Sequence, residues 1–266
     1  MSIQERQQPI IEIVDLVTAY GQRRILDGIN LQILPGETMT ILGRSGCGKS
    51  TLLRHLIGLS KPSQGHIFIK GQDITSLSEE EMLPIRRKIG MLFQGAALFN
   101  SMTVGDNVAL PLREHTALEE PTIKIMTRMK LDQVGLAGFD DFMPAQLSGG
   151  MKKRAALARA IAMDPDILFC DEPSAGLDPI VAVGIDHLIL KLKKAFHMTI
   201  VVVTHELASV SLIADRVALL DSGRIIALGT VEQLKQSADD KVQQFFNRIP
   251  DPESIDRESY LNSLIE

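Results

Sequence analysis

The chain has 266 residues, of which 45% are apolar and 23% are charged, and its formal net charge is −5. This length can bury a substantial core, as one large domain or as a domain with an inserted subdomain. The acidic balance and the lack of a long Lys/Arg run argue against a nucleic-acid partner and against a polybasic membrane anchor. No apolar run approaches the roughly 20 residues of a membrane-spanning helix.

Segments rich in Ile and Val at residues 10–14, 25–33 and 66–69 have the composition of β-strands and are bounded by Gly or Pro. They flank a short apolar strand at 37–42, which leads into a Gly-rich loop and then into a helix predicted over 49–59. A strand followed by such a loop and a helix is the opening of an α/β unit.

The middle of the chain predicts a helical insert. From about residue 95 to residue 164 strand patterns are absent, and helical periodicity dominates from Thr103 onward. Apolar strands return at 167–170, 199–203 and 216–220, where they alternate with helices. This alternation predicts a mainly parallel sheet with right-handed crossovers.

Residues 43–50, GRSGCGKS, fit the pattern G-x-x-x-x-G-K-[ST] of a phosphate-binding loop. The glycines let backbone N–H groups turn toward phosphate oxygens, and the dipole of the following helix favours anions at its start. Lys49 is expected to contact the β- and γ-phosphates of ATP, and Ser50 to ligate Mg²⁺. The alternative, a chance Gly-rich turn, is disfavoured by the strand before the loop and the helix after it. The predicted ATP-binding residues of this segment are Gly43, Arg44, Ser45, Gly46, Cys47, Gly48, Lys49, Ser50 and Thr51.

The apolar strand at 167–170 ends in two acids, Asp171 and Glu172. Asp171 suits the coordination shell of Mg²⁺, and Glu172 suits a general base that polarises an attacking water. On its own this pair could be a solvated acidic turn. Downstream of a phosphate-binding loop, it predicts the second half of a nucleotide-hydrolysing site.

Residues 147–151, LSGGM, are followed by KKRAALARA. Ser148, Gly149, Gly150 and Met151 resemble the LSGGQ signature of the ATP-binding subunits of ABC transporters, with Met151 where Gln is usual. The pattern also fits a plain helix with Ser148 as its N-cap and an Ala-rich body. In both interpretations a Ser-capped helix start with two glycines is a small positive surface that can approach a γ-phosphate closely.

Other landmarks of the ABC family fall in order, so the resemblance covers about residues 10–233. Tyr20 stands where the family has an aromatic residue that stacks on adenine; a core tyrosine is the alternative. Gln94 matches a glutamine that touches Mg²⁺ or the water and responds to the membrane partner. Asp178 closes a match to the D-loop, and His205 matches the histidine that contacts the γ-phosphate. The resemblance thus implies catalytic roles for Glu172, His205 and Gln94, and Mg²⁺ ligation by Ser50, Gln94 and Asp171.

The resemblance implies an α/β P-loop NTPase of the RecA-like kind, with a mainly parallel core sheet, an antiparallel β subdomain, an inserted helical subdomain and a short C-terminal helical extension. The expected division is an ATP-binding core at 1–94 and 165–240, a helical signature subdomain at 95–164 and an assembly extension at 241–266. One loop and one signature per chain imply a head-to-tail dimer with a second copy. Each ATP would then lie between the phosphate-binding loop of one copy and residues 148–150 of the other.

The segments MLFQGAALF at 91–99 and NVALPLREH at 107–115, with the LSGGM variant, resemble one branch of the family, the ATPase subunits of Mla-type phospholipid transporters. This branch implies phospholipid transport between the inner and outer membranes through an integral membrane permease, with a STAS-domain small subunit and an MCE-domain lipid-binding protein. It also implies a peripheral location at the cytoplasmic face of the inner membrane. The alternatives are an ABC ATPase of another transporter, a soluble Fe–S assembly ATPase, or a different P-loop enzyme such as a small-molecule kinase.

The two cysteines, Cys47 and Cys170, fit a reducing cytoplasm rather than a disulfide framework. One interpretation is that both are small buried residues. The other is that Cys47, close to a helix N-terminus, has a lowered pKa and is reactive.

The spacing of Val242, Phe245, Phe246 and Ile249 predicts an amphipathic helix near the C-terminus. Prolines follow it, and apolar residues then return to the end of the chain. We therefore expect residues 249–266 to be an assembly element that docks across an ATPase dimer or onto an accessory subunit. Packing of this segment on its own domain is the alternative.

Overall fold

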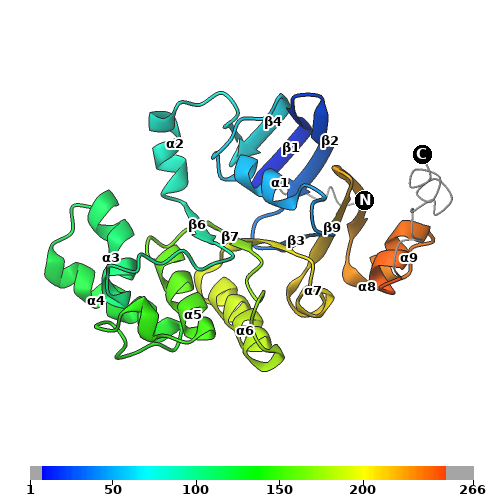
Figure 1. Cartoon of the computed structure of the whole chain (residues 1–266). Helices are drawn as coiled ribbons and strands as arrows, with labels where there is room; N and C mark the ends of the chain where they lie inside the picture. The colour runs from blue at the N-terminus through cyan, green and yellow to red at the C-terminus, as the bar shows by residue number, and fades with distance from the viewer. Residues whose placement is uncertain (1–7, 250–266) are drawn as a thin grey trace, which may run out of the picture.

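A six-stranded sheet with the order β10–β9–β3–β8–β7–β6 forms the centre of the molecule, in a computed structural model that describes residues 8–249 (Figure 1). All neighbouring strands pair in parallel except β10, which is antiparallel to β9. The expected, mainly parallel core sheet is confirmed. Its strands are β3 (Thr38–Gly43), β6 (Ile89–Leu92), β7 (Ile167–Asp171), β8 (Thr199–Thr204), β9 (Arg216–Asp221) and β10 (Arg224–Gly229).

Alternate residues of the central strands enter two different cores. Phe169 and Val201 pack in the core that the sheet shares with α1 (Lys49–Leu56) and with a second, antiparallel sheet. Cys170 and Val202 point to the opposite face, into the core built with α3 (Val104–His115), α5 (Gly149–Ala160) and α6 (Pro179–Phe196). Because successive side chains of a strand alternate between faces, a strand covered on both sides reads as a continuous apolar run.

A second, four-stranded sheet with the order β2–β1–β4–β5 lies over one face of the core (Figure 1). Its members are β1 (Ile11–Tyr20), β2 (Arg23–Ile33), β4 (Gln64–Ile69) and β5 (Gln72–Asp73), and all pairings are antiparallel. The sequence located β1, β2 and β4 but not the short β5, and it ended the first strand at residue 14. The true strand continues to Tyr20, and this extension carries the tyrosine to the edge of the functional site.

Helix α1 (Lys49–Leu56) is shorter than the predicted 49–59. Gly58 adopts φ 68° and its N–H bonds to the carbonyl of His55, while the N–H of Leu59 bonds to the carbonyl of Arg54. This glycine-based C-terminal motif satisfies the last carbonyls and ends the helix.

The chain between β6 and β7 is helical. Residues 93–166, all of which the structure describes, contain no strand. Thr103 caps α3 by accepting the N–H of Asp106 at 3.0 Å, as the periodicity from Thr103 onward leads one to expect. The sequence did not locate α2 (Glu79–Arg86), although Ser78 and Glu81 form a capping box at its start. The helices between β6 and β7 are α3 (Val104–His115), α4 (Glu120–Gln133), η1 (Pro144–Gln146) and α5 (Gly149–Ala160).

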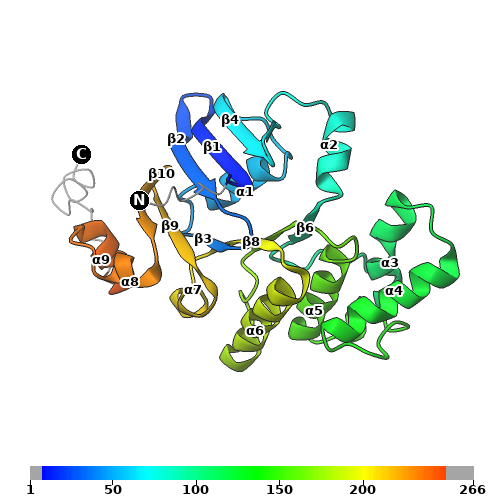
Figure 2. The same cartoon turned by 180° about the vertical axis from the view of Figure 1, so that it is seen from behind.

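The last helices pack on the edge of the sheet formed by β9 and β10, beside α7 (Leu207–Ile213), as Figure 2 shows. These last helices are α8 (Val231–Lys235) and α9 (Asp240–Phe246). The amphipathic helix predicted from Val242 to Ile249 is present, but it ends at Phe246, and Ile249 is 52% exposed. Val242 is buried against residues of β9. The interpretations made for residues 250–266 lie outside the described part of the chain.

None of the helices within residues 8–249 combines the length and the hydrophobicity that crossing a bilayer requires.

Candidate functional site

The loop between β3 and α1 wraps around the ammonium group of its own lysine. Lys49 is buried, and its Nζ donates to the carbonyl oxygens of Gly43 at 2.8 Å and Arg44 at 2.9 Å. Gly48, the N-cap of α1, has φ 111°, and a Cβ there would lie 2.8 Å from the side chain of Leu26. The loop is therefore curled at a point that requires glycine, and it holds a positive charge in front of a helix N-terminus.

Separate parts of the chain line one cavity of about 500 Å³ beside this loop. Tyr20 and Arg23 come from the β1–β2 hairpin, while Gln94, Glu172 and His205 follow β6, β7 and β8. The carboxyl ends of parallel strands meet at one edge of a sheet, which explains why residues far apart in sequence converge here. The predicted residues in the cavity wall are Tyr20, Ser45, Gly46, Gly48, Lys49, Ser50, Thr51, Gln94, Glu172 and His205.

Tyr20 is 60% exposed, so the interpretation as a core tyrosine is wrong. Gly43 and Cys47 lie in the loop but, within the described residues, outside the cavity wall. Gly43 instead supports the loop from behind, since a Cβ there would lie 2.3 Å from the carbonyl oxygen of Leu220. Arg44 faces a neighbouring cavity.

Glu172 occupies a backbone conformation that is unusual for a residue with a side chain. Its φ is 46°, in the left-handed region, and the residue is only 8% exposed. Its N–H bonds to the carbonyl of Val203 at 2.8 Å. The carboxylate accepts from Thr204 Oγ1 at 3.0 Å and from His205 Nδ1 at 2.8 Å. Main chain and side chain are thus both held, so the carboxylate has a fixed direction at the cavity.

Oxygen donors near the cavity suit Mg²⁺, which prefers hydroxyl, carboxylate, phosphate and water ligands. Ser50 offers a hydroxyl and Gln94 an amide oxygen in the cavity wall, and Asp171 ends the strand next to them. Burial and the neighbouring charge of Glu172 raise the pKa of the Asp171 carboxyl, so a cation would stabilise its charged form. Within residues 8–249 no group of three or more His, Cys, Asp and Glu side chains could hold a metal alone. The residues therefore fit an ion that is completed by phosphate and water.

The sequence analysis missed a buried cation beneath the site. Lys153 of α5 is 5% exposed, and its Nζ donates to the backbone carbonyls of Gln94 and Glu172, the latter at 3.1 Å. Burial lowers the pKa of this lysine. The available signal is its position three residues after Gly150 and four before Leu157, which places it on the buried face of α5.

Residues 148–151, the signature segment, lie away from this cavity. Ser148 caps α5 by accepting the N–H of Met151 at 3.3 Å. A Cβ on Gly150 would lie 2.5 Å from Val181 Cγ1, so this glycine lets α5 pack closely on α6. Ser148 and Gly149 are exposed, and none of the four residues is in the cavity wall. The exposed surface of the signature segment therefore lies outside the nucleotide-binding cavity of its own chain.

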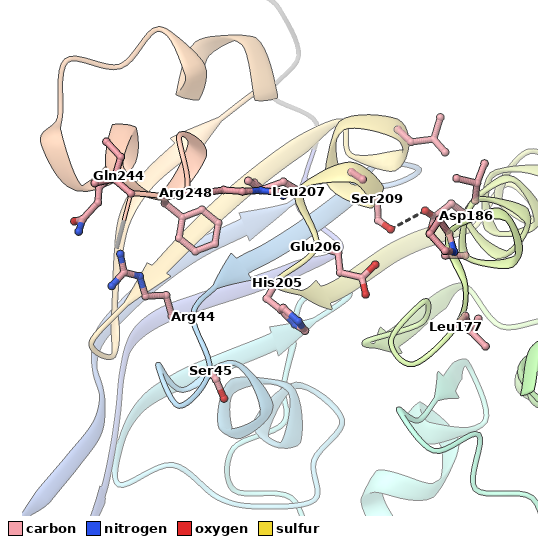
Figure 3. A pocket seen from close by; sticks show the side chains of 17 residues that line it. Arg44, Ser45, Leu177, Asp186, His205, Glu206, Leu207, Ser209, Gln244 and Arg248 are labelled. Atoms are coloured by element: carbon pink, nitrogen blue, oxygen red, sulfur yellow. Dashed lines mark hydrogen bonds between the residues drawn. The ribbon is translucent and has the colours of Figure 1, made fainter. Parts of the chain in front are cut away.

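A second cavity, of about 760 Å³, adjoins the first and shares Ser45 and His205 with it (Figure 3). It lies between the loop, α6, α7 and the end of α9. The predicted D-loop residue Asp178 caps α6 nearby by accepting the N–H groups of Ile180 and Val181.

A chain of polar side chains runs along the wall of the second cavity, which Asp186, Glu206 and Ser209 line. Ser209 Oγ donates to Asp186 Oδ2 at 2.7 Å (Figure 3). Ser209 Oγ also contacts Ser174 Oγ at 3.1 Å, and Ser174 Oγ donates to Glu206 Oε2 at 3.0 Å. Burial raises the pKa of Asp186. The sequence analysis did not anticipate this chain, which connects α6, α7, the turn after β7 and the neighbour of His205.

Both cysteines are buried. Burial raises the pKa of the Cys47 thiol and raises that of Cys170 to about 12. The interpretation of Cys47 as a thiol with a lowered pKa is therefore wrong. Desolvation of the Cys47 thiol raises its pKa more than the charge of Lys49 lowers it. The alternative interpretation, that both cysteines are small buried residues, agrees with the structure.

The ABC transporter family matches residues 26–175, more than half of the chain. Together with the P-loop NTPase fold and the site around Lys49 and Glu172, this match shows an ATP-hydrolysing cassette: the chain belongs to the ABC transporter family.

Among curated proteins, the chain is 48% identical to the intermembrane phospholipid transport system ATP-binding protein MlaF of Haemophilus influenzae, over 90% of each chain. It is 42% identical to the probable ribonucleotide transport ATP-binding protein mkl of Mycobacterium tuberculosis, over 89% of this chain and 66% of that protein. A dimeric, post-hydrolysis structure of the ATP-binding cassette MJ0796, bound to ADP and Pi, matches with a TM-score of 0.77 and 32% identity, covering 83% of this chain and 98% of that one.

Proposed function

We propose that this chain is the ATPase subunit of a phospholipid transporter and works as a dimer under a membrane permease. One observation carries the proposal: a phosphate-binding loop, Gln94, Glu172 and His205 line one cavity in a chain 48% identical to an intermembrane phospholipid transport ATPase. The expected location is the cytoplasmic face of the inner membrane, where the permease would hold the subunit.

The residues around the cavity divide the work of hydrolysis. Lys49 and the N–H groups at the start of α1 bind the phosphates, and Tyr20 offers an exposed ring to the base. Glu172 takes a proton from the attacking water, because each carboxylate oxygen keeps a lone pair beyond its contact with Thr204 or His205. Ser50, Gln94 and Asp171 would hold Mg²⁺. When bound, that ion neutralises charge on the phosphates.

The signature segment is proposed to complete the site of a second copy. Its exposed Ser148 and Gly149 stand at the positive end of α5 and do not face their own cavity. The dimeric cassette that matches this fold supports a paired arrangement. Each copy would then supply Lys49 and Glu172 to one ATP and residues 148–151 to the other.

The permease is proposed to dock at a groove of about 500 Å³ between α2, β6 and α3. Its wall includes the exposed aromatic rings of Phe93 and Phe99 and the side chains of Arg86 and Arg87. Phe93, which lines the groove, directly precedes Gln94, which lines the ATP cavity. A partner docked in the groove would therefore contact a residue next to the hydrolytic site.

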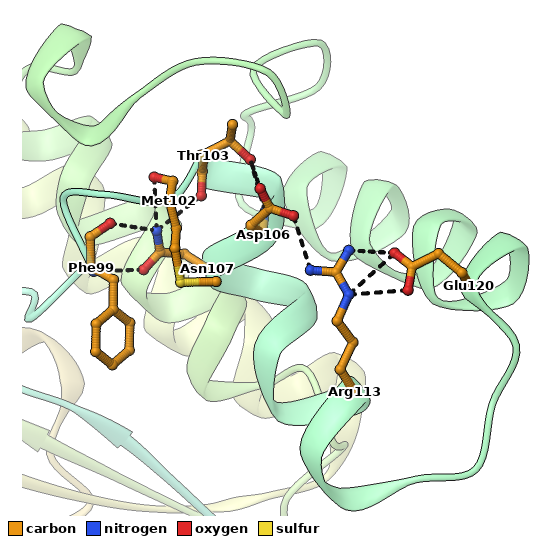
Figure 4. Close-up of polar contacts among 7 residues, drawn as sticks. All are labelled: Phe99, Met102, Thr103, Asp106, Asn107, Arg113 and Glu120. Atoms are coloured by element: carbon orange, nitrogen blue, oxygen red, sulfur yellow. Dashed lines mark hydrogen bonds and ion pairs between the residues drawn. The ribbon is translucent and has the colours of Figure 1, made fainter.

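The loop that carries Phe99 is fixed by one buried side chain (Figure 4). Asn107 is fully buried; its Oδ1 accepts the N–H of Phe99, and its Nδ2 donates to the carbonyls of Phe99, Met102 and Thr103. Arg113 also ties α3 to the start of α4 by bridging Asp106 and Glu120. A rigid loop of this kind presents a defined surface to a partner, which supports the docking proposal.

A STAS-domain small subunit and an MCE-domain lipid-binding protein are the further partners we propose, on the strength of the resemblance to Mla-type transporters. The division into an ATP-binding core (1–94 and 165–240), a signature subdomain (95–164) and an assembly extension (241–266) belongs to the same proposal. Of that extension, α9 packs on its own domain through Val242. The docking role is assigned to the residues after it.

Transport by the reconstituted complex would identify the transported molecule. This test is needed because one relative is named for phospholipid transport and another for ribonucleotide transport. The complex that co-purifies with the tagged chain would be placed in vesicles with labelled phospholipid, and separately with labelled ribonucleotide. We expect ATP-dependent movement of the phospholipid, abolished by Lys49→Ala. Movement of ribonucleotide alone, or co-purification of a soluble Fe–S assembly complex without a permease, would refute the proposal.

A further inference from the structure

Lys153 carries a positive charge deep under the ATP cavity. Its side chain is 5% exposed, and within residues 8–249 no carboxylate oxygen lies at ion-pair distance from its Nζ. The ammonium group instead donates to two backbone carbonyl oxygens, those of Gln94 and Glu172. A buried ammonium group requires hydrogen-bond acceptors, and here each acceptor belongs to a residue of the hydrolytic site.

The contact with the Glu172 carbonyl completes the hold on that residue. Its N–H is fixed by Val203, and its carboxylate is fixed by Thr204 and His205. The carbonyl is the remaining main-chain group, and Lys153 holds it at 3.1 Å. Because Glu172 has φ 46°, a conformation that relaxes unless its surroundings impose it, this third contact helps to keep the carboxylate directed at the cavity.

The same ammonium group holds the turn after β6. Gln94 has its carbonyl bonded to Lys153 while its side chain faces the cavity. One cation therefore fixes the relative positions of Gln94 and Glu172, which follow neighbouring strands β6 and β7.

Helix α5 connects the contacts of Lys153 with the signature segment. It starts with the signature segment, and Lys153 lies little more than one turn after Ser148. The helix that would touch the ATP of a second copy is thus the helix that holds Gln94 and Glu172 of its own copy.

We propose that Lys153 is a positioning residue, which fixes the backbone of Gln94 and Glu172 for hydrolysis and transmits engagement of the signature segment in one ATP site to the catalytic groups of the other. The inference rests on the proposed roles of Gln94 and Glu172. Lys153 itself does not touch the nucleotide.

The test compares Lys153→Met with Lys153→Arg in the full-length chain, co-purified with its permease. Met has a similar length and no donor, whereas Arg keeps donors that can reach both carbonyls. We expect Lys153→Met to lower kcat by about 10–100-fold, because misplaced catalytic groups lose rate more than binding. KM for ATP should change by less than about threefold, and Lys153→Arg should recover most of the kcat.

Lys130→Met is the matched control. Lys130 is also a buried lysine of the helical region, paired with Asp164 at 2.5 Å and lying over the ring of Phe196, away from the ATP cavity. The Lys130→Met substitution should lower the melting temperature of the protein and leave kcat unchanged at temperatures well below it. Hydrogen exchange gives a readout that does not depend on turnover. Faster exchange of peptides covering residues 93–97 and 172–176 in Lys153→Met, and not in Lys130→Met, is expected.

Three outcomes overturn the inference: kcat unchanged in Lys153→Met, loss of activity that follows the melting temperature as in Lys130→Met, or no recovery with Lys153→Arg. Glu172→Gln assayed in parallel separates the two levels of the argument. If it keeps near wild-type turnover, the proposed site itself is wrong. If it is inactive while Lys153→Met is active, only the positioning role fails.

Discussion

Glu172→Gln should remove turnover and leave the fold and ATP binding in place. Replacing the carboxylate by an amide leaves one acceptor oxygen, and the hydroxyl of Thr204 can reverse its direction to suit the new NH₂ group. The stability loss should therefore be about 1 kcal/mol or less. Loss of a general base lowers the rate by roughly 10²–10⁴-fold, or about 3–5 kcal/mol of barrier. The rise in the activation barrier should therefore be several times larger than the loss in the free energy of unfolding.

Steady-state ATPase rates, melting temperatures and fluorescent-nucleotide titrations on the same preparations would check this difference. Size-exclusion chromatography should show that ATP holds the variant as a dimer. Glu37→Gln is a suitable control, because Glu37 is also buried and pairs with Arg216 at 3.1 Å, remote from the cavity. It should lose stability and keep its turnover. A Glu172→Gln protein that hydrolyses ATP at near wild-type rate would show that another group is the base.

Further predictions concern the shared site, the thiol and the tail. Lys49→Ala and Ser148→Arg should each inactivate the protein, and a mixture of the two should regain activity through heterodimers with one intact composite site; a mixture as inactive as its parts would contradict the shared site. Because burial raises the pKa of Cys47, alkylation followed by mass spectrometry should be slow at neutral pH and accelerate as pH rises and thiolate forms. ATP should protect, and a rate independent of pH would contradict burial as the cause. Deleting the residues after Arg248 should impair dimer or accessory-subunit binding without lowering the melting temperature of the monomer; a large drop in monomer stability with assembly intact would favour docking in cis.

The sequence predicted the site where its parts are local or follow from sheet topology. The loop at 43–50 is contiguous, so its pattern alone indicates the curled backbone that Gly48 makes possible. Glu172 and His205 each follow an apolar strand, and parallel strands bring such residues to one edge. The fold class could be predicted for the same reason, since apolar strands alternate with helices.

Contacts across tertiary distances could not be predicted. The link from Lys153 to Gln94 and Glu172 depends on how closely α5 packs under two strand ends, which no spacing along the chain encodes. The helix ends were also misjudged, because a glycine such as Gly58 can either end a helix or lie within one. Periodicity likewise extended the last helix to Ile249, although the helix ends at Phe246 and Arg248 adopts φ 54°.

The polar chain along the second cavity has two hydroxyl hydrogens for three oxygen–oxygen contacts. Ser209 donates to Asp186 and Ser174 donates to Glu206, so the contact between the two serines has no hydrogen of its own. Burial raises the pKa of the Asp186 carboxyl, and no described residue donates to its Oδ1. A proton gained by Asp186 as pH falls would free the Ser209 hydroxyl to turn toward Ser174. The junction between α7 and the turn that precedes the predicted D-loop residue Asp178 is therefore linked to the protonation of a side chain that does not line the ATP cavity.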